Sequence, residues 1–262
     1  MHFFWVEMKI EIKDVSGKKL FSHEEAGNTL AKTIDKALAS GTSLEKADFE
    51  GAHLMGAKLS GVNLSGANLS RAALFRVDFS DAILTKANFS YSSLAGVNMT
   101  GADLTNAVLS RAVLEIGKLS QANLTGADLS YAVLDAADLT GANLNSADLS
   151  NSRCRRTSFM RTTCLQARFD GADLVSNNFS EADLSDASMV KTALRGSTFA
   201  DAKVARANLT DATVYRVDFV RADLQGTVFT GAEFTDVDLT DVSMQEDALS
   251  GVRVKNVILR KF

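Results

Sequence analysis

The stretch Ala102–Asn106 reads ADLTN and the stretch Ala127–Tyr131 reads ADLSY, and most of this chain is built from units of this kind. Every fifth residue from Leu44 to Leu259 is apolar, which makes 44 consecutive units without a break. The residue two positions before each apolar centre is usually small, and Asp or Asn often stands between the two. The repeat therefore decides the fold.

A period of five residues matches neither regular element. On an α-helix, successive centres rotate by about 140° and form no stripe. In a straight strand, an odd period sends successive centres to opposite faces. The chain must therefore turn once in each unit, with Asp103 pointing outward and with Thr105 and Asn106 at the corner. If all corners turn the same way, the sequence predicts a coil whose interior is a column of Leu and Phe.

These units resemble the A(D/N)LXX pattern of the pentapeptide-repeat family over residues 42–261. The resemblance implies an all-β solenoid, namely a right-handed quadrilateral β-helix with four units per coil and about eleven coils. With coils spaced at ~4.8 Å, the rod is roughly 50 Å long. In three units the inward position two residues before the apolar centre departs from the usual small residue: Gly117, Asn177 and Asp247. The polar side chains of Asn177 and Asp247 need hydrogen-bond partners or a position near an end of the rod.

The register makes two predictions about the interior. Four phenylalanines stand at intervals of one coil and are expected to stack as a ladder inside one face: Phe159, Phe179, Phe199 and Phe219. Cys154 and Cys164 are half a coil apart, on opposite walls, so we expect two buried thiols too far apart for a disulfide.

Composition restricts the class of protein further. The 262 residues include no proline, which indicates a backbone that uses nearly every N–H. Two cysteines exclude a disulfide framework, and no apolar run approaches the ~20 residues of a membrane span. The first residues lack a secretory signal, and either Met1 or Met8 is a candidate start. The net charge is −4, and we expect a bacterial, cytoplasmic protein.

Residues 1–43 differ from the repeat and are interpreted as an extension followed by a cap. Residues 8–13 alternate like a strand, residues 14–17 form a turn, and residues 18–21 return as a second strand. Residues 22–25, SHEE, have the spacing of a capping box, and apolar residues at helical spacing follow from Ala26 to Leu38, with Gly41 at the helix end. We therefore expect a hairpin and a helix that cover the first coil of a β-helix over residues 44–262.

The C-terminus has too few residues after the last unit for a cap. The last coil is expected to expose apolar side chains beside unpaired backbone groups, namely Leu249, Val252, Val254, Val257, Leu259 and Phe262. Pairing of two such ends buries this surface, and the family resemblance implies dimers of that kind for some members. The sequence therefore predicts a C-terminal homodimer.

Neither catalytic chemistry nor a cofactor is indicated. The three histidines, at positions 2, 23 and 53, lie far from both cysteines in the repeat register. The sequence contains no phosphate-binding loop, no zinc-spaced cluster and no nucleotide fingerprint. The recurring Asp residues support turns, so we expect a protein that is not an enzyme and that has no cofactor or metal.

Function is therefore expected on the outer surface, where side chains repeat in columns with one member per coil. One corner column alternates cation and aromatic ring: Arg71, Tyr91, Arg111 and Tyr131. Beside it lies an outward column that is unusually apolar, with Phe75 close by: Ala73, Ser93, Val113 and Val133. Such residues are typical of protein-binding surfaces, or they form a ladder that only stiffens the rod. A second candidate is a basic patch that docks an acidic partner or is a solvated surface: Arg153, Arg155, Arg156, Arg161 and Arg168.

Three functions follow from these observations. The first is a rigid protein–protein interaction scaffold. The second comes from the family resemblance: some members mimic duplex DNA, bind DNA gyrase or topoisomerase IV, and confer quinolone resistance. Duplex DNA carries one charge per ~1.7 Å, which disfavours mimicry by a rod of net charge −4. The third, also implied by the family, is a bacterial effector delivered into a host cell. Direct nucleic-acid binding is not expected, because acidic residues outnumber basic ones and the sequence suggests no basic face with aromatic residues.

Overall fold

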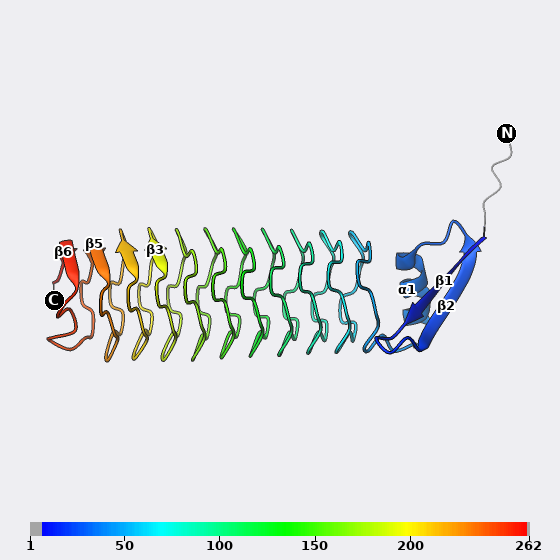
Figure 1. Cartoon of the computed structure of the whole chain (residues 1–262), viewed down its shortest axis with the longest axis horizontal. Coiled ribbons are helices and arrows are strands. Elements are labelled where there is room, and N and C mark those ends of the chain that lie inside the picture. Colours follow the sequence, from blue (N-terminus) through cyan, green and yellow to red (C-terminus); the bar gives the residue numbers. More distant parts are fainter. Residues whose placement is uncertain (1–6, 261–262) are drawn as a thin grey trace, which may run out of the picture.

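The computed structural model describes residues 7–260, and the first six residues and Phe262 lie outside them. The chain forms a long rod of stacked coils, with a hairpin and a helix at its N-terminal end (Figure 1). Parallel bridges join outward residues of successive coils, as between Asp103 and Asn123. At most corners a backbone N–H donates to the carbonyl three residues earlier, as Ala102 does to Met99. The described coils are therefore four-cornered, and each contains four units of the repeat.

The unit Ala102–Asn106 shows why the repeat has its composition. Three of its backbone N–H groups donate to carbonyls of neighbouring coils at 2.7–2.9 Å, those of Asp103, Leu104 and Asn106. The N–H of Ala102 closes the corner turn, and the Asp103 carboxylate accepts the N–H of Thr105 at 3.0 Å. All five N–H groups are thus bonded, and a proline would remove one of these bonds. This accounts for a long repeat without proline.

The last residue of nearly every described unit has a left-handed backbone conformation, with φ of 56° at Asn106 and 66° at Gly126. The residue before it does not have a positive φ, and this combination is that of a type II turn. Glycine adopts such a φ without strain and Asn tolerates it better than most residues. The frequent Gly at this corner follows from that geometry.

The rod interior is one continuous apolar cluster of the repeat centres and their small partners. The predicted phenylalanine ladder is confirmed. Ring centroids lie 4.6 Å apart between Phe159 and Phe179, 4.7 Å between Phe179 and Phe199, and 4.9 Å between Phe199 and Phe219, all stacked. Phe169 meets two of these rings edge-on, at 5.8 and 6.1 Å.

The two polar departures from the repeat have different explanations. Asn177 is buried, but its Oδ1 accepts the N–H of Thr157 at 2.8 Å and its own N–H donates to the Ser197 hydroxyl at 3.0 Å. Its Nδ2 has no partner among the described residues. Asp247 is exposed near the C-terminal end, where a charge needs no internal partner.

At the N-terminal end, β1 (Glu7–Lys13) and β2 (Lys19–Ala26) form an antiparallel pair, followed by α1 (Leu30–Ala39). The predicted capping box at residues 22–25 is wrong, because these residues belong to β2 and pair with β1. The helix starts later, capped by Thr29, whose hydroxyl accepts the N–H of Lys32 at 3.2 Å. Ile12 and Ile34 are buried in the same cluster as the first coils.

At the C-terminal end, four parallel strands stack in the order β3 (Ala193–Arg195), β4 (Thr213–Tyr215), β5 (Glu233–Asp238) and β6 (Arg253–Ile258). β6 is therefore an edge strand. The described apolar residues of the last coil are only partly covered: Val254 and Leu259 are each 55% exposed, and Leu249, Val252 and Val257 are half-buried.

Candidate functional site

One wall of the rod gathers the exposed aromatic residues of the coils. We call it the Tyr/Arg wall and define it as positions 51, 53, 55 and 56 together with their equivalents in every later coil, up to Asn256. Its outward column is continuous, because parallel bridges link Ala73 to Ser93, Ser93 to Val113 and Val113 to Val133. The structure thus assembles the corner column and the apolar column that the sequence predicts.

Arg111 is held between two tyrosine rings on the corner of this wall. Its guanidinium carbon lies 5.8 Å from the ring centroid of Tyr91 and 4.6 Å from that of Tyr131. The two tyrosines are 60% and 50% exposed. A cation within about 6 Å of a ring face is attracted by the ring, so these contacts order three side chains that still face solvent. Arg71, two coils before Arg111, instead contacts Glu50 at 3.7 Å.

The wall extends beyond the predicted residues. Phe75 is exposed and lies under Arg76, whose guanidinium carbon is 4.9 Å from the ring centroid. Farther along the same wall, Tyr215 is contacted by Arg195 at 5.6 Å and by Arg216 at 5.0 Å. Sequence reasoning missed these pairs, although the coil register places them on the same wall as Phe75.

The predicted basic patch is divided by the structure. Arg153, Arg155 and Arg156 lie on the Tyr/Arg wall, whereas Arg161 and Arg168 belong to other columns. Four of the five pair with carboxylates: Arg153 with Glu115 and Asp135, Arg155 with Asp173, Arg161 with Glu181, and Arg168 with Asp148 and Asp170. Five arginines close in sequence therefore do not form a single cationic surface.

Charge is segregated by wall. The Tyr/Arg wall carries eleven basic against six acidic residues, a net charge of +5: Arg71, Arg76, Arg111, Arg153, Arg155, Arg156, Lys191, Arg195, Arg216, Arg253 and Lys255, against Glu115, Asp135, Asp173, Asp211, Glu233 and Asp236. The rest of residues 44–262 carries eleven basic against twenty acidic residues, a net charge of −9. The expectation that no face combines positive charge with aromatic residues is therefore wrong, because folding sorts the side chains by column.

Several arginines of the other walls pair with carboxylates of neighbouring coils. Arg206 donates two hydrogen bonds to Asp186 at 2.7 and 2.6 Å, and Arg221 donates two to Asp201 at 2.6 Å. These bonds lower the pKa of both carboxyl groups. On the Tyr/Arg wall, Arg76 and Arg111 contact rings, and neither has an ion pair among residues 7–260.

Both cysteines are buried free thiols, as the register predicts. Burial raises the pKa of the Cys154 thiol to about 12 and that of Cys164 to about 12. Each thiol therefore stays protonated at neutral pH, whereas a cysteine nucleophile needs its thiolate. Among residues 7–260, no group of three or more His, Cys, Asp or Glu side chains is placed to hold a metal ion, and no helix is long and apolar enough to span a membrane.

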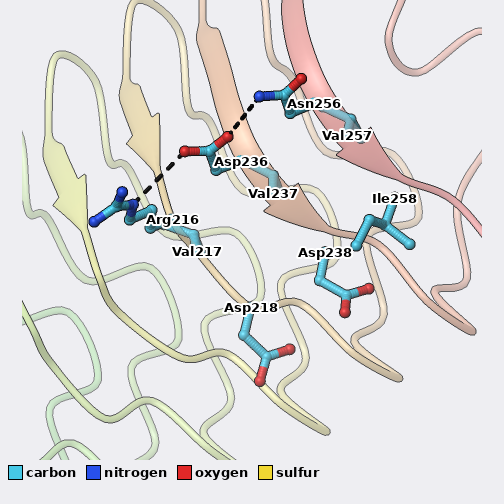
Figure 2. A pocket seen from close by; sticks show the side chains of 9 residues that line it. All are labelled: Arg216, Val217, Asp218, Asp236, Val237, Asp238, Asn256, Val257 and Ile258. Atoms are coloured by element: carbon cyan, nitrogen blue, oxygen red, sulfur yellow. Dashed lines mark hydrogen bonds and ion pairs between the residues drawn. The ribbon is translucent and has the colours of Figure 1, made fainter.

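A cavity of about 530 Å³ lies near the C-terminal end, lined by residues of β5, β6 and the preceding coil (Figure 2). Asp236 stands between Arg216 and Asn256, at 3.6 Å from the Arg216 Nε and 2.9 Å from the Asn256 Nδ2. These polar groups therefore pair with one another along the corner column. The cavity adjoins the exposed β6 edge.

Comparison with known proteins agrees with the repeat. The family model for Pentapeptide repeats matches in eight copies: residues 35–71, 72–111, 109–145, 118–153, 137–174, 178–214, 207–245 and 218–256. No curated protein matches.

Several solved structures are similar to this chain. HetL, a pentapeptide repeat protein involved in heterocyst differentiation regulation in the cyanobacterium Nostoc sp. strain PCC 7120, is 28% identical over 88% of this chain and 95% of HetL, with a TM-score of 0.49. A trypsin-treated form of QnrB1, a plasmid-mediated fluoroquinolone resistance protein, is 22% identical over 68% of this chain and 89% of that chain, also with a TM-score of 0.49. A protein from the Arabidopsis thaliana thylakoid lumen is 35% identical over 41% of this chain and 71% of its own, with a TM-score of 0.29.

Proposed function

The chain belongs to the pentapeptide-repeat family, whose solenoids are right-handed β-helices, and from this premise we propose that it is a rigid, non-enzymatic scaffold that binds a protein through its Tyr/Arg wall. One observation carries the proposal: Tyr91, Arg111 and Tyr131 are ordered by mutual contact while remaining exposed beside Val113 and Val133. Tyr and Arg are enriched among the residues that dominate binding energy at protein interfaces.

The fold makes this surface suitable for binding. In a solenoid each coil contacts only its neighbours, and side chains on one wall keep a fixed spacing along the rod. Tyr91 and Tyr131 are two coils apart, so their rings are separated by roughly 10 Å at the inter-strand spacing. Because Arg111 already holds both rings, a partner loses less conformational entropy in ordering them on binding.

Exchanging both tyrosines tests the proposal. The variant Tyr91→Ser/Tyr131→Ser is expected to lower the capture of the partner from a lysate of the source organism by about tenfold or more, because two interface anchors are removed. The matched control is Leu165→Ser/Val228→Ser, which removes two exposed apolar side chains from other walls and is expected to leave capture unchanged. Unchanged capture with a lowered melting temperature in the tyrosine variant would instead mean a ladder that only stiffens the rod.

Charge favours this function over mimicry of DNA. A mimic needs a continuous anionic surface, whereas the Tyr/Arg wall has a net charge of +5 and several carboxylates of the other walls are paired with arginine. Protection of gyrase supercoiling from ciprofloxacin by the purified protein discriminates the two functions, and a scaffold of the kind proposed gives no protection.

We further propose that residues 1–43 comprise an N-terminal extension and the hairpin and helix of the cap, and that residues 44–262 are the β-helix, in the cytoplasm. The proposal is supported by the apolar residues of the hairpin and helix that pack against the core of the first coils, namely Leu20, Phe21, Leu30 and Leu38. Backbone bonds also join the two parts, since Asp48 donates to Lys13 at 2.8 Å and Val15 donates to Lys46 at 2.9 Å. With the first coil covered, the C-terminal coil is the end of the described solenoid that stays open for pairing.

The C-terminal end is expected to form a homodimer. β6 is an edge strand, and Val254, Ile258 and Leu259 are exposed beside it. Sedimentation equilibrium at micromolar concentration is expected to give about twice the chain mass of 28.0 kDa. Val254→Lys/Leu259→Lys is expected to give the monomer mass, and the control Val228→Lys the dimer mass. A wild-type monomer under these conditions contradicts the dimer.

A further inference from the structure

A row of backbone N–H groups on the Tyr/Arg wall lacks acceptors. Elsewhere the outward Asp or Asn accepts the N–H two residues on, as Asp103 does from Thr105 at 3.0 Å and Asn123 from Thr125 at 3.2 Å. Five successive coils of this wall have no Asp or Asn there, since the outward residues are His53, Ala73, Ser93, Val113 and Val133. No acceptor among residues 7–260 is found for the corresponding N–H groups, those of Met55, Phe75, Ala95, Glu115 and Asp135.

This row is particular to the wall. In the other three corner columns of the described coils, a missing acceptor is confined to one coil at a time, with bonded N–H groups in the coils beside it. In the next coil of the wall the outward residue is Arg153, and there the Asp135 carboxylate of the preceding coil accepts the N–H of Arg155 at 3.0 Å. The five donors recur at the coil spacing and span roughly 20 Å along the rod.

Arg76 and Arg111 lie along the same row and have no ion pair among residues 7–260, and the row also carries the carboxylates of Glu115 and Asp135. Arg76 and Arg111 are stacked on rings. The carboxylates nearest in register, Glu115 and Asp135, are each bound by Arg153 at 2.9 Å. Between Met55 and Asp135 the wall therefore combines cations, hydrogen-bond donors and an apolar strip, and its two acidic residues there are already paired with Arg153.

We infer that the Tyr/Arg wall between Met55 and Asp135 binds an acidic polypeptide segment that runs along the rod. This inference rests on the proposed function and adds the chemistry of the partner. Carboxylates of the segment accept hydrogen bonds from the row of N–H groups and pair with Arg76 and Arg111, and charge-assisted bonds of this kind are stronger than neutral ones. Apolar side chains of the segment cover Val113 and Val133.

A polypeptide fits this wall better than a single-stranded nucleic acid. Base recognition without sequence preference requires open aromatic faces on which bases stack. Arg111 lies between Tyr91 and Tyr131 and takes up the facing side of each ring, so no base can stack between them.

Fluorescence anisotropy with three labelled probes tests the inference. The first is a peptide of about eight residues alternating Glu and Leu, which spans roughly 27 Å when extended. The second is its Lys/Leu counterpart, and the third is an oligothymidylate of similar length. We expect the Glu/Leu peptide to bind more tightly than both other probes, with an affinity that falls as salt concentration rises.

Three double variants identify the groups responsible. Arg76→Gln/Arg111→Gln is expected to weaken binding of the Glu/Leu peptide by about tenfold. Arg206→Gln/Arg221→Gln removes the same charge from other walls and is expected to change it by less than about twofold. Ser93→Asn/Val113→Asn supplies internal acceptors for the N–H groups of Ala95 and Glu115 without changing the charge, and is expected to weaken binding severalfold while keeping or raising the melting temperature.

Several results would overturn the inference: no binding of the Glu/Leu peptide, equal or tighter binding of the Lys/Leu peptide, or equal losses in both arginine variants. Tighter binding of the oligothymidylate, lost in Arg76→Gln/Arg111→Gln, would assign the wall to nucleic acid instead. If the tyrosine variant loses its cellular partner but no acidic preference is seen, the inference alone fails. If the tyrosine variant keeps its cellular partner and no acidic preference is seen, the proposed function fails together with the inference.

Discussion

Replacing Phe179 by alanine is expected to lower the free energy of unfolding by about 3–5 kcal/mol, the usual cost of truncating a buried aromatic side chain. The Phe179 ring lies between Phe159 and Phe199, at centroid distances of 4.6 and 4.7 Å, and meets Phe169 edge-on at 6.1 Å. The side chain is fully buried, and the coils above and below hold the space open through their backbone hydrogen bonds. A cavity at this position therefore cannot easily collapse.

Urea unfolding followed by circular dichroism measures the effect. Phe75→Ala is the matched control, because Phe75 is 37% exposed and its loss is expected to cost less than about 1 kcal/mol. Phe179→Leu is expected to restore much of the stability, since it refills part of the volume. A Phe179→Ala chain as stable as the Phe75→Ala chain would contradict a tightly packed ladder.

Replacing Ala136 by proline is expected to destabilise the rod by about 3 kcal/mol or more. Ala136 has a φ of 56°, whereas proline requires about −65°. Its N–H donates to the carbonyl of Arg155 in the next coil at 2.8 Å, and proline has no N–H. Both the backbone conformation and an inter-coil bond are thus lost at a single site.

A proline at the first of the two corner residues, just before the residue with positive φ, is expected to be tolerated. Ala95 precedes the positive φ of Gly96, so it occupies the position of a type II turn that favours proline, and its N–H has no acceptor among the described residues. Ala95→Pro is therefore expected to change stability by no more than about 1 kcal/mol, in either direction. Thermal and urea unfolding of the two proline variants should differ clearly, and similar losses in both would contradict this account of the repeat's hydrogen bonds.

Much of the solenoid follows from local sequence. The five-residue period is incompatible with a straight helix or strand, and so it predicts the corners, the inward Leu column and the outward Asp. The four-unit coil implied by the family resemblance then places Phe159, Phe179, Phe199 and Phe219 in one stack. These features need only the regularity of the repeat.

The N-terminal segment shows where local patterns mislead. Residues 22–25 have the spacing of a capping box, yet they extend β2 because pairing with β1 satisfies their backbone groups. Thr29 can equally cap a helix and does so. Two local signals compete here, and the hairpin pairing across Glu7–Ala26 decides between them.

The sequence by itself determined the repeat, the buried column, the absence of proline and the Tyr/Arg corner, because each depends on residues within one unit or on a constant register. Only the tertiary structure decided which arginines keep their charge available and which N–H groups lack acceptors. Arg111 between two rings and Arg206 on Asp186 look alike in sequence. They differ because stacking places a different side chain from a neighbouring coil beside each, and that neighbour determines what the surface can bind.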